Sequence, residues 1–233
     1  MTSVIDLRDP VSSASHLLTA IWAVFATLVM LRLAAHRPGR LVPLAVYGVS
    51  MILLFLASGT FHGLHYDTPE QKRFFQKLDM SAVYLLIAGT YTPVLAIVLT
   101  GAWRAWFLRM VWLMALAGVG CLWLLPKPPH AAMVSFYLAL GWLGILPLPV
   151  YYRALGWRAM NYVWVGAALY SAGAICELTH WPVIVPGWVQ WHEVLHFCDT
   201  AGSVTFFLFV VRYVIPFRAA LPQPEGVTAP RAA

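Results

Sequence analysis

The sequence predicts an all-α membrane protein, a seven-transmembrane helix bundle, and three observations support this fold class. Hydrophobic residues make up 61% of the 233 residues and charged residues only 10%, whereas a soluble domain of this size is about a quarter charged. The apolar residues form long continuous runs, which fit helical spans of about 20 residues rather than the alternating pattern of a membrane β-barrel. The 11 Trp and 10 Tyr residues suit the aromatic belts at the two membrane surfaces.

Polar and proline-rich breaks divide the chain into runs of spanning length. The first run follows a segment that contains Asp6 and Asp9, and no clear cleavage site comes after it, so we expect a retained span rather than a signal peptide. A charged stretch at residues 67–77 separates the second run from the third, and residues 126–130 end the fourth. The expected spans, in order, are His16–Leu33, Leu41–Leu64, Leu78–Leu99, Trp106–Leu125, Ala131–Tyr152, Tyr162–Trp181 and Val189–Val214.

Two further features of the spans can be predicted. Pro147 and Pro149 predict a bend near the end of the fifth span. Small residues in the sixth span, among them Gly166 and Gly173, predict close packing against a neighbouring helix. The expected parts of the chain are an N-terminal segment at residues 1–15, the seven-helix transmembrane domain at residues 16–215, and a tail at residues 216–233 whose prolines predict disorder.

The formal net charge of +6 would raise nucleic acid as a partner for a soluble protein. Here the Lys and Arg residues lie mainly at span ends and in connections, where they act as topology signals and contact lipid headgroups. No nucleic-acid partner is therefore expected. Most of the 15 Lys and Arg residues fall at the end of the bundle where the first span finishes, so the positive-inside rule places the other end outside the cytoplasm.

That other end of the predicted bundle collects ionisable side chains, which are costly in a membrane and therefore indicate function. It is the end where the second, fourth and sixth spans finish and the third, fifth and seventh begin. The opposite end has no comparable set of histidines and acids, and His36 is the histidine expected there. The residues expected to gather are His62, His65, Asp79, Glu177, His180, His192, Glu193 and His196.

Two pairs of polar residues have the spacing of one helical turn. Ser58 and His62 are four residues apart, as are His192 and His196, so each pair lies on one face of its helix. Two imidazoles so placed can bind one metal ion, and a third histidine from another helix would complete a three-histidine set with a fourth position for water. Asp79, expected at the start of the third span, could orient that water, and the N-terminal end of its helix would favour the ionised carboxylate.

Each of these residues also has a simpler role open to it. His65 and His180 are typical of interfacial or hydrogen-bonded histidines. Asp79 could cap its helix, and Ser58 could hydrogen-bond to a carbonyl of its own helix. Residues 192–196 read His-Glu-Val-Leu-His, which matches the short H-E-x-x-H pattern of zinc proteases, whose glutamate is the general base.

Two blocks of sequence resemble the hemolysin III family of bacterial membrane proteins, which is related to the adiponectin and progestin receptors. They are residues 50–62, SMILLFLASGTFH, and residues 78–93, LDMSAVYLLIAGTYTP. The second block is long and nearly verbatim. With the His-x-x-x-His of the last span, the resemblance covers about residues 11–214.

The resemblance implies a seven-helix bundle with zinc near one membrane face, in a bacterial plasma membrane. Carried onto this sequence, the family pattern makes His62, His192 and His196 the zinc ligands. In that pattern Asp79 reaches zinc through water and Ser58 supports the site. The related receptors are read with this face toward the cytoplasm, which conflicts with the charge count.

Three residues depart from the family pattern. Met80 and Phe206 stand where many members have a histidine, and Glu193 stands where many relatives have another residue. Neither Met80 nor Phe206 occupies the position of a core ligand, so the expectation of zinc remains. Glu193 either adds a carboxylate near the metal or faces water.

Three hypotheses for function follow. The first is zinc-dependent hydrolysis of a lipid amide or ester, with a membrane lipid as the partner, Asp79 handling the attacking water and Ser58 assisting; the link to the receptors and to ceramidases implies that substrate class. The second is a receptor-like or lipid-homeostasis protein with structural zinc. The third is an intramembrane metalloprotease with Glu193 as its base.

Overall fold

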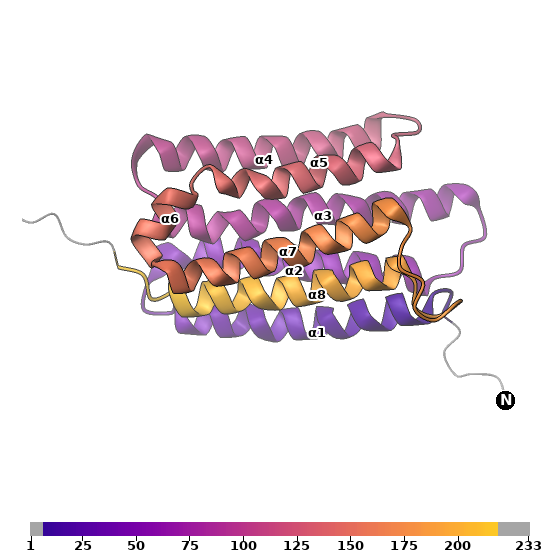
Figure 1. Cartoon of the computed structure of the whole chain (residues 1–233), viewed down its shortest axis with the longest axis horizontal. Coiled ribbons are helices and arrows are strands. Elements are labelled where there is room, and N and C mark those ends of the chain that lie inside the picture. The colour runs from indigo at the N-terminus through magenta and orange to yellow at the C-terminus, as the bar shows by residue number, and fades with distance from the viewer. Residues whose placement is uncertain (1–6, 219–233) are drawn as a thin grey trace, which may run out of the picture.

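The computed structural model describes residues 7–218, and this part of the chain is almost entirely helical (Figure 1). Within these residues, strand-like pairing is limited to one isolated bridge between Val185 and Val189. A 3-10 segment, η1 (Leu143–Ile145), follows α5, and a π-helical segment, η2 (Val210–Val214), continues α8. The α-helices are α1 (Pro10–Leu33), α2 (Pro38–Gly63), α3 (Pro69–Val98), α4 (Gly101–Leu124), α5 (His130–Trp142), α6 (Leu148–Leu155), α7 (Trp157–Thr179) and α8 (Trp191–Phe209).

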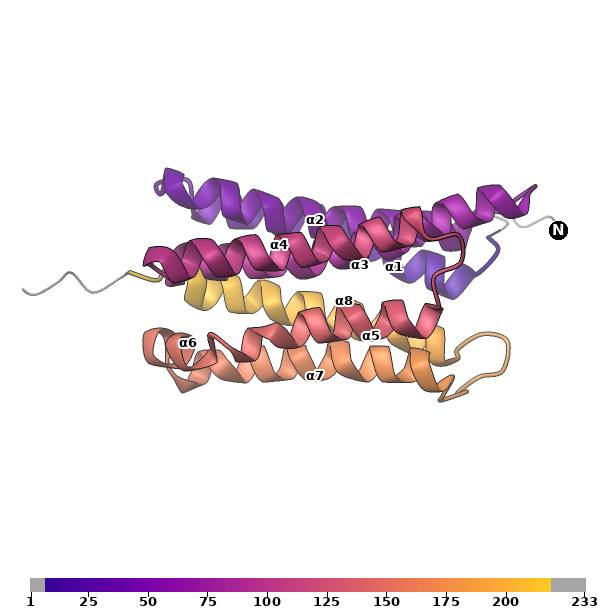
Figure 2. The same cartoon turned by 90° about the horizontal axis from the view of Figure 1, so that it is seen from above.

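The helices run side by side along one axis, and α5 and α6 together make one pass (Figures 1 and 2). α2 packs between α1 and α3, α3 packs on α4, and α8 packs between α7 and α1. Figure 2 shows α5 and α7 together on the side of the bundle away from α2. The ends of α2, α4 and α7 therefore share one end of the bundle with the starts of α3, α5 and α8, as the sequence predicted.

The apolar helices confirm a multi-pass integral membrane protein. In the described residues, α1, α2, α3, α4 and α8 with η2 are each long and apolar enough to span a membrane. The pair of α5 with η1 and α6 passes the same test together, bent by 49°, so the bend predicted from Pro147 and Pro149 is confirmed. α7 does not pass the test, and the count of seven spans stays a prediction. Large apolar side chains such as Leu18, Phe25 and Leu113 are more than half exposed, as lipid-facing residues are.

α3 begins earlier than expected, at Pro69 rather than at Leu78. The Thr68 side chain accepts a hydrogen bond from the backbone N–H of Gln71 at 3.2 Å, and the charged residues that follow form the first turns of the helix because no Gly or Pro interrupts them. Asp79 therefore lies about three turns inside α3. The expectations that Asp79 caps its helix or is stabilised by the helix N-terminus are wrong.

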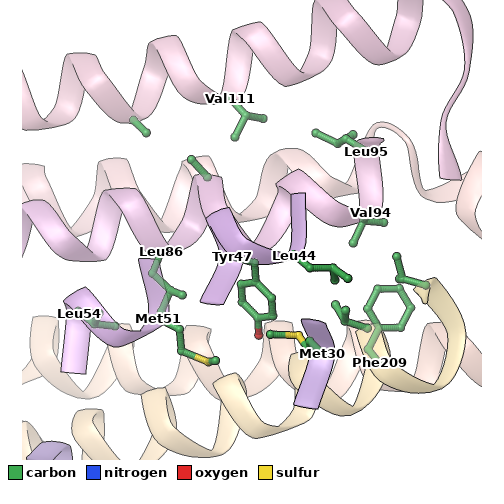
Figure 3. Packing of buried hydrophobic residues seen from close by; sticks show 14 of the residues in the cluster. Met30, Leu44, Tyr47, Met51, Leu54, Leu86, Val94, Leu95, Val111 and Phe209 are labelled. Atoms are coloured by element: carbon green, nitrogen blue, oxygen red, sulfur yellow. The ribbon is translucent and has the colours of Figure 1, made fainter. Parts of the chain in front are cut away.

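Buried apolar side chains from all eight described α-helices form the core of the bundle, and those labelled in Figure 3 lie on α1, α2, α3, α4 and α8 or its π-helical continuation. Tyr47 of α2 lies near Met30 of α1 and Phe209 of α8, and each of these three side chains is at most 1% exposed. The predicted close packing of α7 is confirmed: a Cβ at Gly166 would lie 2.5 Å from the Phe206 ring. This packing brings α8, α7 and α2 close enough for the side chains at their ends to meet.

Candidate metal centre

Three histidine rings meet at the end of the bundle where the loop between α7 and α8 lies, at the right of Figure 1. His62 comes from the last turn of α2, and His192 and His196 come from the first turns of α8. The ring centroids lie 4.7 Å to 4.8 Å apart, and the Nε2 atoms of His62 and His192 are 3.1 Å apart. One nitrogen from each ring lies within 4.8 Å of the other two. The structure thus brings together the three predicted ligands, hereafter the three-histidine cluster.

The start of α8 fixes the direction of two of the rings. A capping box closes it: the Gln190 side chain accepts from the backbone N–H of Glu193, and Glu193 Oε2 accepts from the backbone N–H of Gln190 at 2.9 Å. The other oxygen of Glu193 accepts from the Ser12 hydroxyl of α1 at 2.7 Å. With the first turn held in this way, His192 and His196 project from one face of α8.

The second ring nitrogen, Nδ1, of each histidine in the cluster faces a hydrogen-bond acceptor. Two of the acceptors are carboxylates and the third is a backbone carbonyl, and they come from two segments of the chain, the start of α1 and the end of α7. For His62, His192 and His196 in turn, they are Asp9 Oδ2 at 3.0 Å, Glu177 Oε2 at 2.8 Å and the Ser12 carbonyl oxygen at 3.4 Å.

These contacts determine which nitrogen of each ring is free. Carbonyls and ionised carboxylates only accept hydrogen bonds, so Nδ1 of each ring carries the proton. Asp9 precedes the first helix, and although burial raises its pKa, hydrogen bonds from His62 and Arg8 outweigh this and lower the pKa below its usual value. In a neutral imidazole protonated at Nδ1, Nε2 keeps an unshared lone pair.

A cation is the partner that such an arrangement favours. Two Nε2 lone pairs 3.1 Å apart repel each other unless a proton or a metal ion lies between them. Tetrahedral zinc with Zn–N bonds of about 2.0–2.1 Å holds its ligand nitrogens roughly 3.3 Å apart, close to the observed spacing of this pair. Carboxylates and carbonyls on the other ring nitrogen are the usual supporting partners of histidine ligands. The residues present therefore fit a metal ion.

A polar cavity of ≈ 60 Å³ adjoins the cluster. Asp79 of α3 and Ser58 of α2 both line it. Met80, one of the departures from the family pattern, also lines this cavity. Besides His192 and His196, the ionisable residues in its wall include His16, Asp79, His130, Glu177 and Asp199.

A larger cavity of ≈ 180 Å³ continues from the polar one between α3, α5, α7 and α8. Its wall is mostly aliphatic and aromatic, and it includes Phe206, where many family members have a histidine. The two cavities adjoin because they share wall residues, namely Leu54, Val83, Tyr137, Leu195 and Asp199.

Three of the residues expected at this end lie outside both the three-histidine cluster and the polar cavity. His65 is exposed in the connection between α2 and α3, and His180 is exposed at the end of α7. Glu193 is engaged by the Ser12 hydroxyl and by the start of its own helix. The structure therefore does not bring these three side chains to the cluster.

His16 contributes to the site although the sequence reasoning did not select it. Its ring stacks on that of His196, with centroids 3.8 Å apart and an angle of 10° between the planes. Its Nε2 lies 3.3 Å from the His196 carbonyl oxygen. A histidine inside the first apolar run was the available signal, since ionisable residues are rare within spans.

Asp9, His130 and Asp199 were also missed. His130 Nε2 lies 2.9 Å from Oε1 of Glu177, the carboxylate that holds His192. Asp9 and His130 lie in segments that looked like connections, so only the folded structure reveals their role. Asp199 could have been found, because it follows His192 by seven residues on the same helical face.

Comparisons with known proteins agree with this description. The family model described as Haemolysin-III related matches residues 7–207. Hemolysin-3 of Bacillus cereus is 34% identical over 214 residues, which cover 90% of this chain and 94% of that protein. Hemolysin-3 homolog of Bacillus subtilis (strain 168) is 32% identical over 175 residues, 75% of this chain and 78% of that protein.

These relatives are bacterial, and together with the apolar helices they place the chain in the bacterial plasma membrane as a multi-pass protein. The family resemblance predicted from residues 50–62 and 78–93 is confirmed by a match over most of the chain. The chain belongs to the haemolysin-III-related family of membrane proteins.

Proposed function

We propose that this chain is a zinc-dependent membrane hydrolase that cleaves an amide or ester bond of a lipid. The observation that carries the proposal is the three-histidine cluster, in which each Nδ1 faces an acceptor and each Nε2 is left free. Three histidines with one open position are a ligand set of catalytic zinc sites. Zinc held there would supply Lewis-acid chemistry, polarising a carbonyl and making water acidic enough to react near neutral pH.

Asp79 is the side chain placed to handle the attacking water. Its carboxylate lines the polar cavity beside the cluster, so it accepts the proton that water loses as the water oxygen bonds to the carbonyl carbon. Ser58 donates a hydrogen bond to that carboxylate or to the carbonyl oxygen as negative charge develops on it. Asp79 then gives the proton to the leaving nitrogen or oxygen, and the products are a fatty acid and an amine or alcohol.

The adjoining apolar cavity supports a lipid as the substrate. It lies within the membrane-spanning part of the bundle and opens onto the polar cavity through shared wall residues such as Leu54 and Leu195. Its mostly hydrocarbon wall suits an acyl chain. A lipid whose chain occupies this cavity presents its first carbonyl group to the three-histidine cluster.

Release of fatty acid by the purified chain tests the proposal. The full chain, reconstituted with zinc in lipid nanodiscs, is incubated with N-acyl and O-acyl lipids, and released fatty acid is measured by mass spectrometry. We expect Asp79→Asn to lower the rate by at least about 100-fold, the size expected for loss of a general base. Its zinc content should match that of the unmodified chain.

Glu193→Gln is the matched control, since it is the same acid-to-amide change in a carboxylate outside the polar cavity. It should keep the hydrolysis rate, and glutamine still serves at this position of a capping box. Equal rates for Asp79→Asn and the unmodified chain, or no zinc-dependent release at all, would overturn the proposal. Loss of activity in Glu193→Gln alone would instead favour the protease arrangement.

A second candidate function has one observation in its favour. The cluster joins α2 to α8, and its Nδ1 contacts reach Ser12 of α1 and Glu177 of α7, so a metal ion would cross-link four helices. Structural zinc in a receptor-like or lipid-homeostasis protein predicts that chelation lowers the melting temperature while Asp79→Asn leaves every lipid readout unchanged.

A further inference from the structure

Asp199 is an ionisable residue that the proposed hydrolysis does not use. It lies on α8, three residues after His196, on the face that carries the three-histidine cluster. Among the described residues that line the apolar cavity, it is the one that can carry a formal charge near neutral pH. A carboxylate in the wall of a hydrocarbon cavity is costly, so its presence calls for a ligand or a partner.

The described part of the chain provides no such partner. Asp199 makes no hydrogen bond and no ion pair with another described residue, unlike Asp9 and Glu177, each of which faces histidines. The Tyr170 hydroxyl in the same wall, by contrast, is already paired, because it shares a hydrogen bond of 2.9 Å with Ser203. The acceptor oxygens of Asp199 are therefore available to a molecule that enters the cavity.

The position of Asp199 defines where such a molecule would be held. Asp199 belongs to the wall of both cavities, as does Tyr137, whose hydroxyl also makes no hydrogen bond within the described residues. Hydrocarbon surrounds Asp199 on the side of the larger cavity, and the three-histidine cluster lies about one to two helical turns away on α8. A ligand at Asp199 thus has its apolar part in the larger cavity and its polar group at the junction.

We propose that Asp199 is a binding residue for the polar group of a long-chain amphiphile that carries a hydrogen-bond donor, a hydroxyl or an ammonium. A carboxyl group offers an acceptor oxygen whether or not it is ionised, so a donor on the ligand is the complementary chemistry. Methylated or fully esterified lipids lack this donor and would leave the oxygens of Asp199 unpaired, which is unfavourable in a dry site.

This inference rests on the proposed function only for its consequence in catalysis. If the chain hydrolyses lipids, Asp199 selects substrates or products that bear a hydroxyl or ammonium beside the scissile bond over those that bear none. The binding step itself requires no hydrolysis. It can therefore be tested with ligands that contain no cleavable bond, which separates its failure from failure of the hydrolase proposal.

The test compares three photoactivatable probes with one long saturated chain each: a primary alcohol, its methyl ether and the corresponding primary amine. Binding to the purified full chain in detergent micelles is measured as the fraction photolabelled at increasing probe concentration, and the labelled peptides are identified by mass spectrometry. We expect the unmodified chain to bind the alcohol about tenfold more tightly than the ether, as one hydrogen bond to a buried acceptor provides. Labels should fall on residues of the apolar cavity.

Three variants show which residue is responsible for the preference for the alcohol over the ether. Asp199→Val removes the acceptor, so the preference for the alcohol should fall to about twofold or less while the ether still binds. Asp199→Asn keeps an acceptor without charge, so it should keep the alcohol and lose an amine that binds as ammonium. Thr90→Val, which changes a residue of the same cavity without touching the junction, should keep the full preference.

Two results would overturn the inference. The first is equal binding of alcohol and ether by the unmodified chain. The second is an Asp199→Val variant that keeps the preference or binds neither probe, because the residue would then maintain the cavity rather than bind the donor group. Retention of the ether by Asp199→Val serves as the check that the variant is folded.

Discussion

The two ends of the bundle are held together by opposite chemistry. At one end lies the three-histidine cluster, whose Nδ1 atoms face acceptors and whose Nε2 atoms face one another. At the other end, the guanidinium groups of Arg37 and Arg40, beside the start of α2, donate hydrogen bonds to carbonyls at and just beyond the end of η2. The acceptors of these arginines are Val214, Ile215 and Phe217.

The two ends differ in whether the chain itself supplies the hydrogen-bond partner: the arginines find acceptors within the chain, whereas the Nε2 lone pairs of the cluster lack donors among the described residues. The last carbonyls of a helix have no partner within the helix, and here the two arginines supply donors to Val214, Ile215 and Phe217 from within the chain. At the cluster, the chain supplies acceptors for three N–H groups and leaves three lone pairs without a donor. Changes at the cluster should therefore alter metal binding, and changes at the arginines should alter stability alone.

His196→Ala should have the largest effect, because it removes one of the three ligands and leaves an insufficient set. We expect zinc affinity to fall by more than about 100-fold, beyond the loss typical of a supporting residue. Zinc content after dialysis, measured by elemental analysis, and titration against a chelator check this. His65→Ala is the control, since His65 is exposed in a connection, and equal zinc loss in both variants would contradict the assignment of the cluster.

Glu177→Gln should have a smaller effect on the same quantity. Glu177 accepts from both His130 and His192, and an amide can accept from only one of them through its oxygen. Loss of this contact typically weakens metal binding by about 10- to 100-fold. The same chelator titration measures it, with Glu70→Gln at the start of α3 as the control. Unchanged affinity would show that the His192 ring is oriented by other contacts.

Much of this site could be predicted because its ligands follow helical spacing. His192 and His196 are one turn apart, and the number of spans places His62 at the same end of the bundle. The family resemblance then selected His62 as the third ligand. The sequence predicted correctly that Asp79 lies at that end of the bundle, but it wrongly put Asp79 at the first turn of its helix. The charged residues before it were expected to form a connection, but capping by Thr68 starts α3 there.

The supporting partners could not be predicted, since they depend on where irregular segments settle. Asp9 precedes α1 and contacts His62 only because the backbone N–H of Asp9 donates to the His62 carbonyl at 3.0 Å. No spacing rule links residues so far apart in the sequence. His16 is a different case, because its stacking on His196 depends on the packing of α1 against α8.

Arg40→Met tests the end of the bundle that Arg37 and Arg40 hold together, and it should give the smallest effect. Methionine keeps a long apolar stem but no donor, so the carbonyls of Val214, Ile215 and Phe217, at and just beyond the end of η2, lose charge-assisted hydrogen bonds. Because Arg40 is only partly buried and Arg37 still donates to Ile215, we expect a cost of about 1 kcal/mol, which lowers the melting temperature by roughly 2–4 °C. Thermal unfolding in detergent measures this, with the exposed Arg104→Met as the control. Zinc affinity should not change, and a fall in zinc affinity would mean that the two ends are coupled through α2 and α8 rather than independent.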